Sequence, residues 1–306
     1  MRIGVFSQAA AEPGATVANV IAEAREFEAE GFDFISYPQI FGLDAMTLAA
    51  VVGQQTQRIE LATGVVPSPP RHPYAMAQQA LTVQAACAGR FNLGIGLSHQ
   101  VVTEGMFGLS YAKPAKQMRE YVSVLAPLLR GERASFDGDL YRVHADLQVP
   151  EADRVPLLIA ALGPLMLEVA GTLADGTATW MTGVRTLGSH TVPTIRDAAR
   201  EAGRPSPRIL ASLPTSLVSD LDAARAKANE SFAIYNSLPS YRAMLDREGA
   251  GSQPGDVALL GDEAELRASL NRLRDAGVTE FCAVFLNAEK GSGRRTREFL
   301  ASELKG

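Results

Sequence analysis

The segment FNLGIGLSHQ, residues 91–100, combines residue types and a spacing that suit the binding of a nucleotide-like group. An apolar run leads into Gly94 and Gly96, spaced as in the G-x-G-x-x-G loop of dinucleotide sites. His99 stands where that motif has its third glycine. The segment therefore predicts a strand that ends in small residues and one imidazole, and it argues against a pyrophosphate-binding helix start here.

A second segment, AALGPLML at residues 160–167, is a candidate for holding a phosphate. Gly163 and Pro164 mark the start of a helix. The free N–H groups and positive dipole end of a helix start can hold an anion without a basic side chain. A Gly-Pro helix start is more often only a boundary signal, so both interpretations stay open at this point.

Residues for metal-dependent or nucleophilic catalysis are sparse. No G-x-S-x-G elbow occurs, and Cys87 and Cys282 fall inside apolar or small-residue segments rather than at predicted strand ends. The histidines show no pairing at the spacing of metal ligands; they are His72, His99, His144 and His190. We therefore expect no metal site, and a cofactor that supplies the chemistry while the protein supplies shape and hydrogen bonds.

Composition narrows the class of partner. The net charge is −5, from 29 basic and 34 acidic residues, which gives no electrostatic footprint for nucleic acid or anionic lipid. No apolar run approaches the ~18 residues of a membrane span, and the N-terminus is too short in apolar residues for a signal peptide. Two distant cysteines suit a reducing compartment. We expect a cytoplasmic protein that binds small molecules or further copies of itself.

Short apolar runs alternate with amphipathic helical segments along the whole chain. Runs such as PLLIAAL are apolar throughout, as parallel strands covered by helices on both faces are. Eight such units in 306 residues predict an α/β fold, a closed (β/α)₈ TIM barrel, with strands within residues 2–7, 32–38, 59–66, 91–97, 156–162, 177–182, 209–218 and 279–287.

Two stretches interrupt this alternation. Residues 131–155 contain FDGDLYRV, whose D-G pair predicts a small hairpin, and we interpret the stretch as an insertion after the fourth helix. Residues 221–260 are long for one strand-helix unit. No polar linker divides the chain, so we expect a single barrel domain over residues 1–306 with these insertions.

The barrel prediction also selects the place of the site, because active sites of this fold lie at the carboxyl ends of the strands. These ends carry one histidine, almost no acidic residue and no lysine; they include residues 64–67, 96–99, 162–164 and 179–182. Small residues at such ends let a large flat ring approach the backbone. Arg71 and His72, within PPRHPY, are better explained as a helix-start turn between prolines.

At this point the chain resembles the bacterial-luciferase-like flavin and deazaflavin oxidoreductases, in particular the branch that uses coenzyme F420. The resemblance rests on RHP and GR-F-x-LG-x-G within residues 62–99, on ALGP and ADG within 160–180, and on residues 257–281. It covers nearly the whole chain in the right order. It implies a (β/α)₈ barrel with insertions, coenzyme F420 with FMN as the alternative, and a homodimer.

The resemblance also implies roles for particular residues. It places a non-prolyl cis peptide at Gly64-Val65, against the central ring of the cofactor. His99 is the implied catalytic residue, as hydrogen-bond partner of the cofactor or proton donor, although a structural histidine is the alternative. The implied cofactor-binding residues are Gly64, Val65, Gly96, His99, Leu162, Gly163, Pro164, Gly176, Ala178, Thr179 and Trp180. Trp180 suits either a substrate wall or plain barrel core.

One departure from the family pattern bears on the reaction. Sugar-phosphate dehydrogenases of the family carry a histidine at the second strand end and a glutamate in the fourth-strand loop, where this chain has SYPQIFG and GIGLSHQ. We therefore expect hydride transfer between reduced F420 and a small organic substrate, with an activated C=C or C=N bond as acceptor. An FMN-dependent luciferase-like monooxygenase and a non-catalytic F420-binding protein are the alternatives.

Overall fold

Eight parallel strands close into a barrel in the computed structural model, which describes residues 1–304. The circle closes because β9 pairs with β10 and β12 pairs with β1. In order around the barrel the strands are β1 (Arg2–Phe6), β2 (Phe34–Tyr37), β3 (Glu60–Thr63), β5 (Phe91–Gly96), β8 (Leu157–Ile159), β9 (Gly176–Trp180), β10 (Arg208–Leu217) and β12 (Glu280–Phe285). The predicted (β/α)₈ barrel is confirmed, with every strand inside its predicted range or within one residue of it.

Two short strands extend the sheet at the carboxyl end of the barrel. β4 (Val66–Pro67) continues the line of β3 after a break and pairs with β5. β11 (Leu259–Gly261) pairs with the long strand β10. The break between β3 and β4 contains the Gly64-Val65 peptide bond, which is cis as the family resemblance implies.

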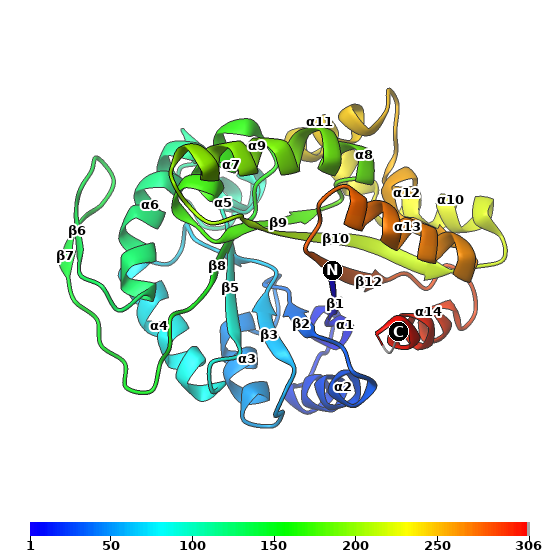
Figure 1. The fold of residues 1–306 in the computed structure, drawn as a ribbon, viewed down its shortest axis with the longest axis horizontal. Coiled ribbons are helices and arrows are strands. Elements are labelled where there is room, and N and C mark those ends of the chain that lie inside the picture. The colour runs from blue at the N-terminus through cyan, green and yellow to red at the C-terminus, as the bar shows by residue number, and fades with distance from the viewer. Residues whose placement is uncertain (305–306) are drawn as a thin grey trace.

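Helices surround the strands (Figure 1). Their ends follow the local sequence: Asp44 caps one helix by accepting a hydrogen bond from the Thr47 N–H at 2.8 Å, and Gly31 ends another in the left-handed conformation at φ 101°. The α-helices are α1 (Gln8–Ala11), α2 (Val17–Glu30), α3 (Ala45–Gly53), α4 (Pro73–Ala86), α5 (Gln100–Gly105), α6 (Pro114–Leu129), α7 (Pro164–Leu173), α8 (Val184–Thr186), α9 (Val192–Glu201), α10 (Leu221–Ser231), α11 (Pro239–Glu248), α12 (Pro254–Val257), α13 (Glu263–Asp275) and α14 (Ser292–Glu303).

The middle of the barrel is filled by apolar side chains. Phe34, Leu158, Leu210 and Cys282 form one buried cluster. Gly4 makes room for the Phe34 ring, since a Cβ at this position would lie 2.5 Å from three of its ring carbons. The barrel is therefore a packed core at this level, as in other barrels of this class.

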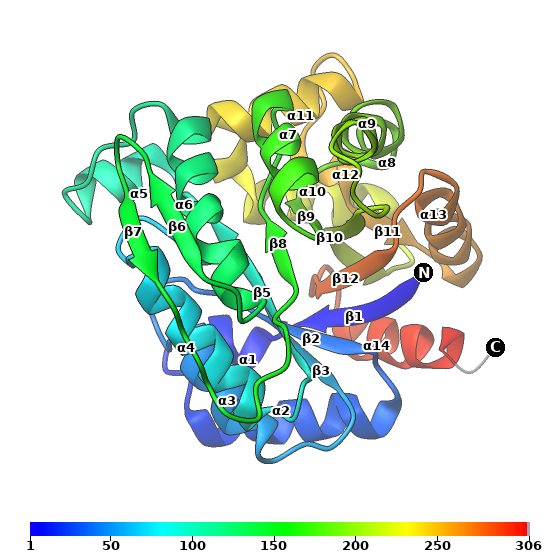
Figure 2. The same cartoon turned by 60° about the vertical axis from the view of Figure 1, so that its left-hand side comes forward.

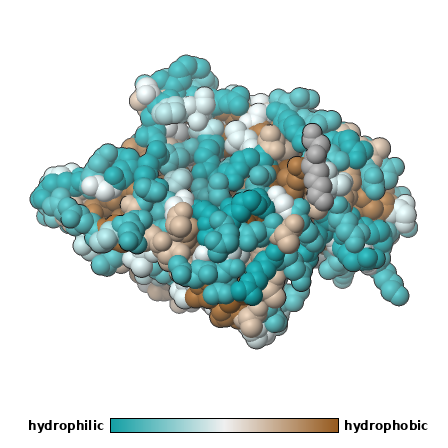
Figure 3. All heavy atoms as spheres, turned by 60° about the horizontal axis from the view of Figure 1, so that its bottom comes forward, coloured by the Kyte–Doolittle hydropathy of each residue, from teal (hydrophilic) through white to brown (hydrophobic). Residues whose placement is uncertain are grey.

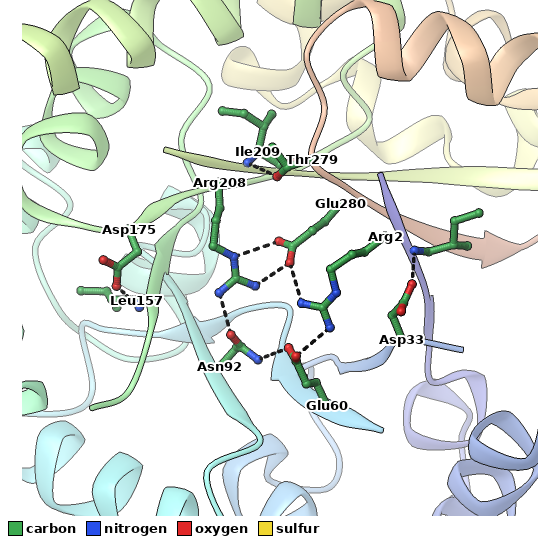
Figure 4. Close-up of polar contacts among 11 residues, drawn as sticks. Arg2, Asp33, Glu60, Asn92, Leu157, Asp175, Arg208, Ile209, Thr279 and Glu280 are labelled. Atoms are coloured by element: carbon green, nitrogen blue, oxygen red, sulfur yellow. Dashed lines mark hydrogen bonds and ion pairs between the residues drawn. The ribbon is translucent and has the colours of Figure 1, made fainter. Parts of the chain in front are cut away.

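The amino end of the barrel is closed by a ring of polar side chains (Figure 4). Glu280 bridges Arg208, at 2.7 Å, and Arg2, at 3.2 Å. Asn92 accepts from Arg208 at 2.7 Å and donates to Glu60 at 3.0 Å, and Glu60 meets Arg2 at 2.7 Å. Five strands thus contribute one side chain each, and every charge in this floor ring has a partner of opposite charge.

The insertion after α6 forms the predicted hairpin, β6 (Ala134–Asp137) paired antiparallel with β7 (Arg142–Ala145). It projects from the side of the barrel (Figure 1). Glu120 of α6 holds the turn by accepting from the N–H groups of Leu140, at 2.7 Å, and Tyr141, at 3.3 Å. Within residues 1–304, no helix is both long and apolar enough to cross a bilayer.

The outer surface differs from place to place. On the face in Figure 3, which includes the bottom of Figure 1, hydrophilic residues predominate and apolar ones form separate patches. α2 and α3 expose one large apolar side chain each, Val17 and Val51. The second long stretch, residues 221–260, contains α10, a 3₁₀ turn (Ala233–Asn236), α11 and α12, and α11 packs beside α8 (Figure 2).

Candidate active site

The carboxyl end of the barrel is lined by small or apolar side chains. Strand register directs alternate residues inward: Phe6 is level with Ser36, and Ser212 is level with both Trp180 and Cys282. The inward set, which we call the mouth, is Phe6, Ala160, Ala178, Trp180, Ser212 and Val284. All six are only partly buried although they lie inside the barrel, so solvent reaches this end.

The break between β3 and β4 opens onto this end. Gly64 is exposed and Val65 is half-buried, and a Cβ on Gly64 would overlap the Ser36 hydroxyl. A Cβ on Gly96 would lie 3.0 Å from a Val65 methyl and 3.2 Å from the Ala160 methyl. Gly64, Val65 and Gly96 therefore form one closely packed surface, which we call the shelf. Neither glycine has room for a larger side chain without a shift of its neighbours.

His99 follows β5 at the same end. It occupies the first position before α5 without capping that helix, and Ser98 before it is left-handed, at φ 62°. Such a conformation is strained for a non-glycine residue and is typical of functional sites. Burial lowers the pKa of the imidazole, so it is neutral at pH 7. The ring is thus held at the mouth as an uncharged donor and acceptor.

The start of α7 is not capped by a side chain. Leu162 and Gly163 are half-buried, Pro164 is exposed, and open space surrounds the position of a Gly163 Cβ. The Nε2 atom of His190 lies 2.9 Å from the Leu162 carbonyl oxygen, and this hydrogen bond fixes the turn. A helix start with unused N–H groups and a dipole end is suited to an anion. Sequence reasoning missed His190, because nothing in a separation of 28 residues signals the contact.

β9 brings only part of its predicted set to the mouth. Ala178 and Trp180 point inward, whereas Thr179 is buried and its hydroxyl donates to the Leu210 carbonyl at 3.3 Å. Gly176 lies at the opposite, amino end of β9, where a Cβ would overlap the backbone of Arg208. Close packing of two strands therefore explains this glycine without a cofactor.

An aromatic wall, defined as Trp180, Phe232, Tyr235 and Tyr241, stands beside His99. Ring centroids are 5.5 Å apart for Trp180 and Phe232, 5.9 Å for Trp180 and Tyr235, and 4.7 Å for Tyr235 and Tyr241. Tyr241 in turn lies 5.7 Å from the His99 ring. The one sign of this wall in the sequence was the excess length of residues 221–260, since Tyr241 is 142 residues from its histidine contact.

The other polar residues near these segments have hydrogen-bond or ion-pair partners within the protein. His72 caps α4, its Nδ1 accepting from the Tyr74 N–H at 3.2 Å, and Arg71 pairs with Asp44. Glu104 accepts from Gln100 at 2.9 Å on exposed α5. Among residues 1–304, no group of three or more His, Cys, Asp or Glu is placed to hold a metal ion.

A closed barrel, an uncharged mouth and a free helix start define a (β/α)₈-barrel enzyme. The chain belongs to the luciferase-like monooxygenase family, whose model matches residues 1–295.

Proteins similar to this chain include an F420-dependent enzyme and an FMN-containing one. An F420-dependent glucose-6-phosphate dehydrogenase of Nakamurella multipartita is 30% identical over 72% of this chain and 65% of its own length. A 5,10-methylenetetrahydromethanopterin reductase of Methanolobus tindarius is 26% identical over 89% of this chain and 91% of its own. The FMN complex of a type II Baeyer–Villiger monooxygenase from Pseudomonas putida superposes with a TM-score of 0.78, at 16% identity, over 99% and 97% of the two chains.

Proposed function

We propose that this chain is an F420-dependent oxidoreductase that transfers a hydride between reduced coenzyme F420 and a small organic substrate with an activated C=C or C=N bond. The observation that carries the proposal is the mouth, where small and apolar side chains without charge face solvent inside the barrel. Such a mouth offers no acid, base, nucleophile or metal set of its own besides His99. A bound cofactor has to supply the reactive atom.

The residues present fit a flat ring with a phosphate-bearing side chain. Gly64, Val65 and Gly96 would form the shelf against which the ring lies, because Gly64 is exposed and Val65 half-buried at the open end of the barrel. The uncapped start of α7, at Gly163 and Pro164, would hold the phosphate through backbone N–H groups. Ala178 leaves space beside them. We assign no cofactor contact to Gly176 or Thr179.

The reduced cofactor, when bound, supplies a hydride to the electrophilic carbon of the acceptor bond. The protein's part is to position the acceptor and complete the proton balance. Neutral His99 would donate an N–H hydrogen bond to the other atom of that bond and pass this proton to it while the second ring nitrogen takes a proton from water, so that the imidazole stays neutral. Trp180 and its aromatic neighbours exclude water from one side.

The direction that we propose is reduction of the acceptor. A neutral imidazole can serve either direction, as a base toward an alcohol or as a proton relay toward an acceptor. A carboxylate partner would favour its use as a base, and the mouth contains none, while Glu104, the nearest carboxylate along the chain from His99, is engaged by Gln100 on the exposed side of α5. In the direction of reduction, His99 would relay one proton from water to the acceptor.

Cofactor choice is tested by anaerobic titration of the full-length protein with coenzyme F420 and, separately, with FMN. We expect binding of F420 and oxidation of reduced F420 at its absorbance band once an acceptor is added. Tight binding of FMN alone, with oxygen-dependent product formation, would establish the FMN monooxygenase instead. Bound F420 that no donor or acceptor changes would establish a cofactor-binding protein without catalysis.

The remaining parts of the proposal are a homodimer and a cytoplasmic location. Both rest on the family resemblance and on composition, including two buried thiols, Cys87 and Cys282, that form no disulfide. Burial raises the pKa of these thiols, to about 11 and about 12, so they stay protonated. Light scattering of the purified protein measures its mass, and a monomer would contradict the first part.

A further inference from the structure

The aromatic wall gives the mouth a defined chemistry on one side. Its rings meet edge to face, with interplanar angles of 76° for Trp180 and Phe232, 70° for Trp180 and Tyr235 and 68° for Tyr235 and Tyr241. This arrangement is favourable for aromatic pairs and extends one continuous surface from β9 to His99. A further ring or conjugated plane adds to such a surface by the same contacts.

The wall carries no charge at neutral pH. Burial raises the pKa of Tyr235 and Tyr241 and lowers the pKa of His99, so all three are uncharged. The nearest cation along the chain, Arg242, is engaged by Asn236 and Asp246, each at 2.9 Å. An anionic group at the wall would lose its hydration without gaining an ionic partner.

One polar donor is nonetheless available beside the wall. The Trp180 indole N–H is buried next to the Tyr235 hydroxyl, so it faces the wall itself. The Tyr111 hydroxyl makes only a long contact, 3.5 Å from the Ser98 carbonyl oxygen, and its side chain is partly exposed. A hydroxyl with so weak a partner can donate to the carbonyl oxygen of a ligand.

The approach to the mouth is apolar as well. Several large apolar side chains in segments that follow strand ends are exposed; they are Ile40, Phe41, Val101, Met106 and Ile234. By contrast, α2 and α3 expose only Val17 and Val51 of this kind. Exposed apolar side chains at one end of a protein mark a place where an apolar partner or ligand enters.

We infer that the substrate of this enzyme is an uncharged, planar, conjugated carbonyl compound, and that Tyr241 and Trp180 determine this specificity. The inference rests on the proposed function for the reaction but not for the binding preference. The ligand's plane packs on the wall and its carbonyl oxygen accepts a hydrogen bond there. Sugar phosphates and carboxylates are disfavoured because the wall itself is uncharged and Arg242, the cation nearest to it along the chain, is already paired.

Binding is measured by titration calorimetry on the full-length protein, with and without oxidised F420 so that no turnover occurs. The probes are benzalacetone, its saturated relative benzylacetone, and cinnamate, which shares the conjugated skeleton but is an anion. We expect benzalacetone to bind more than about tenfold more tightly than cinnamate, and more tightly than benzylacetone. Equal or tighter binding of cinnamate would overturn the inference.

Variants locate the site. Tyr241→Ala and Tyr241→Leu should each weaken benzalacetone binding about tenfold, Tyr241→Phe should retain it, and Leu140→Ala at the exposed hairpin tip is the control. Tyr241→Leu keeps an apolar side chain in place, so it tests the loss of the ring without the loss of packing. Unchanged binding in both non-aromatic variants would refute the role of Tyr241.

Trp180 supplies an independent readout, since it is the chain's single tryptophan. Its emission, corrected for probe absorbance with free N-acetyltryptophanamide, should change on binding of benzalacetone, and an unchanged emission would place the ligand elsewhere. The outcomes separate the two proposals. Failure of F420 to bind, with the probe preference intact, refutes the proposed function alone. Hydride transfer from F420 with a preference for anions refutes the inference alone.

Discussion

The two ends of the same eight strands are built in opposite ways. At the amino end, the floor ring of Arg2, Glu60, Asn92, Arg208 and Glu280 pairs every charge it contains. At the carboxyl end, the mouth consists of uncharged side chains that are all only partly buried. The side chains at the amino end therefore stabilise the fold by pairing with one another. Those at the carboxyl end stay accessible to a ligand.

This contrast teaches that stability and function can be altered separately in this chain. In barrels of this class, residues at the floor act on folding and residues at the carboxyl ends act on chemistry. Substitutions at the floor should change the free energy of unfolding and leave cofactor binding unaffected. Substitutions at the mouth should do the reverse.

The largest effect is expected at the floor, from Glu280→Ala. Glu280 is 2% exposed and is the shared partner of Arg2 and Arg208, so its removal leaves two guanidinium groups without their shared carboxylate. Breaking a fully buried ion pair from one side costs about 3–5 kcal/mol. Arg2 and Arg208 are partly exposed and keep Glu60 and Asn92 as partners, so we expect about 2–3 kcal/mol here. Urea denaturation should show this loss of unfolding free energy, while the F420 affinity of the folded fraction stays unchanged. A matching loss of affinity would contradict the separation of the two ends.

His99→Gln should affect turnover most among changes at the mouth. A glutamine keeps hydrogen-bonding groups but cannot relay a proton, and general acid catalysis contributes about a hundredfold or more. We expect turnover to fall by about this factor, with a much smaller change in F420 affinity and in the urea midpoint. His144→Gln, on the exposed hairpin, is the matched control. Equal turnover in the two variants would reduce His99 to a structural role.

Gly163→Asp should change stability and binding in opposite directions. Gly163 has φ −80° and ψ 158°, which aspartate adopts readily, and its Cβ would enter open space. An aspartate here caps α7 and adds roughly a few tenths of a kcal/mol to the free energy of unfolding, since glycine is already a tolerated N-cap. The same carboxylate occupies and repels the proposed phosphate position, so F420 affinity should fall about tenfold or more. Gly163→Ala provides the comparison without charge. Normal F420 binding by the Gly163→Asp variant would show that the phosphate does not bind at this helix start.

The smallest effect is the pH dependence of stability that comes from His99. Its pKa is lower in the folded state than in the unfolded chain, because burial disfavours the cation. Below the unfolded pKa of about 6.5 the unfolded state binds more protons, so stability falls as the pH falls. Melting curves between pH 8 and 5 should show a shallower decline for His99→Gln than for the parent chain. A steeper decline would show that the folded state favours the cation.

Prediction from sequence succeeded where information is local. Apolar runs gave the eight strands, and the D-G pair gave the hairpin, because each depends on neighbouring residues. Gly64-Val65 was placed through its family pattern and the cis bond is present. The floor ring was missed, because its five members span residues 2 to 280 and meet only when the barrel closes.

The site was predicted in part for the same reason. Gly96, His99 and Trp180 were predicted as site residues because they end strands, and the structure places all three at the carboxyl end of the barrel, where their roles stay a prediction. Gly176 was placed with them, yet it lies at the start of β9 against Arg208. Tyr235 and Tyr241 could not be assigned, since a helical insertion has no fixed place relative to the strands until it packs.

The wall residues Phe232, Tyr235 and Tyr241 belong to a segment that supplies none of the eight strands of the barrel. Phe232 and Tyr235 lie between α10 and α11, and Tyr241 lies in the first turn of α11. Exchanging these side chains changes no residue of the eight strands or of the floor ring. Residues 232–241 are therefore the place for a mutant library that tests the inferred substrate preference while the barrel strands stay intact.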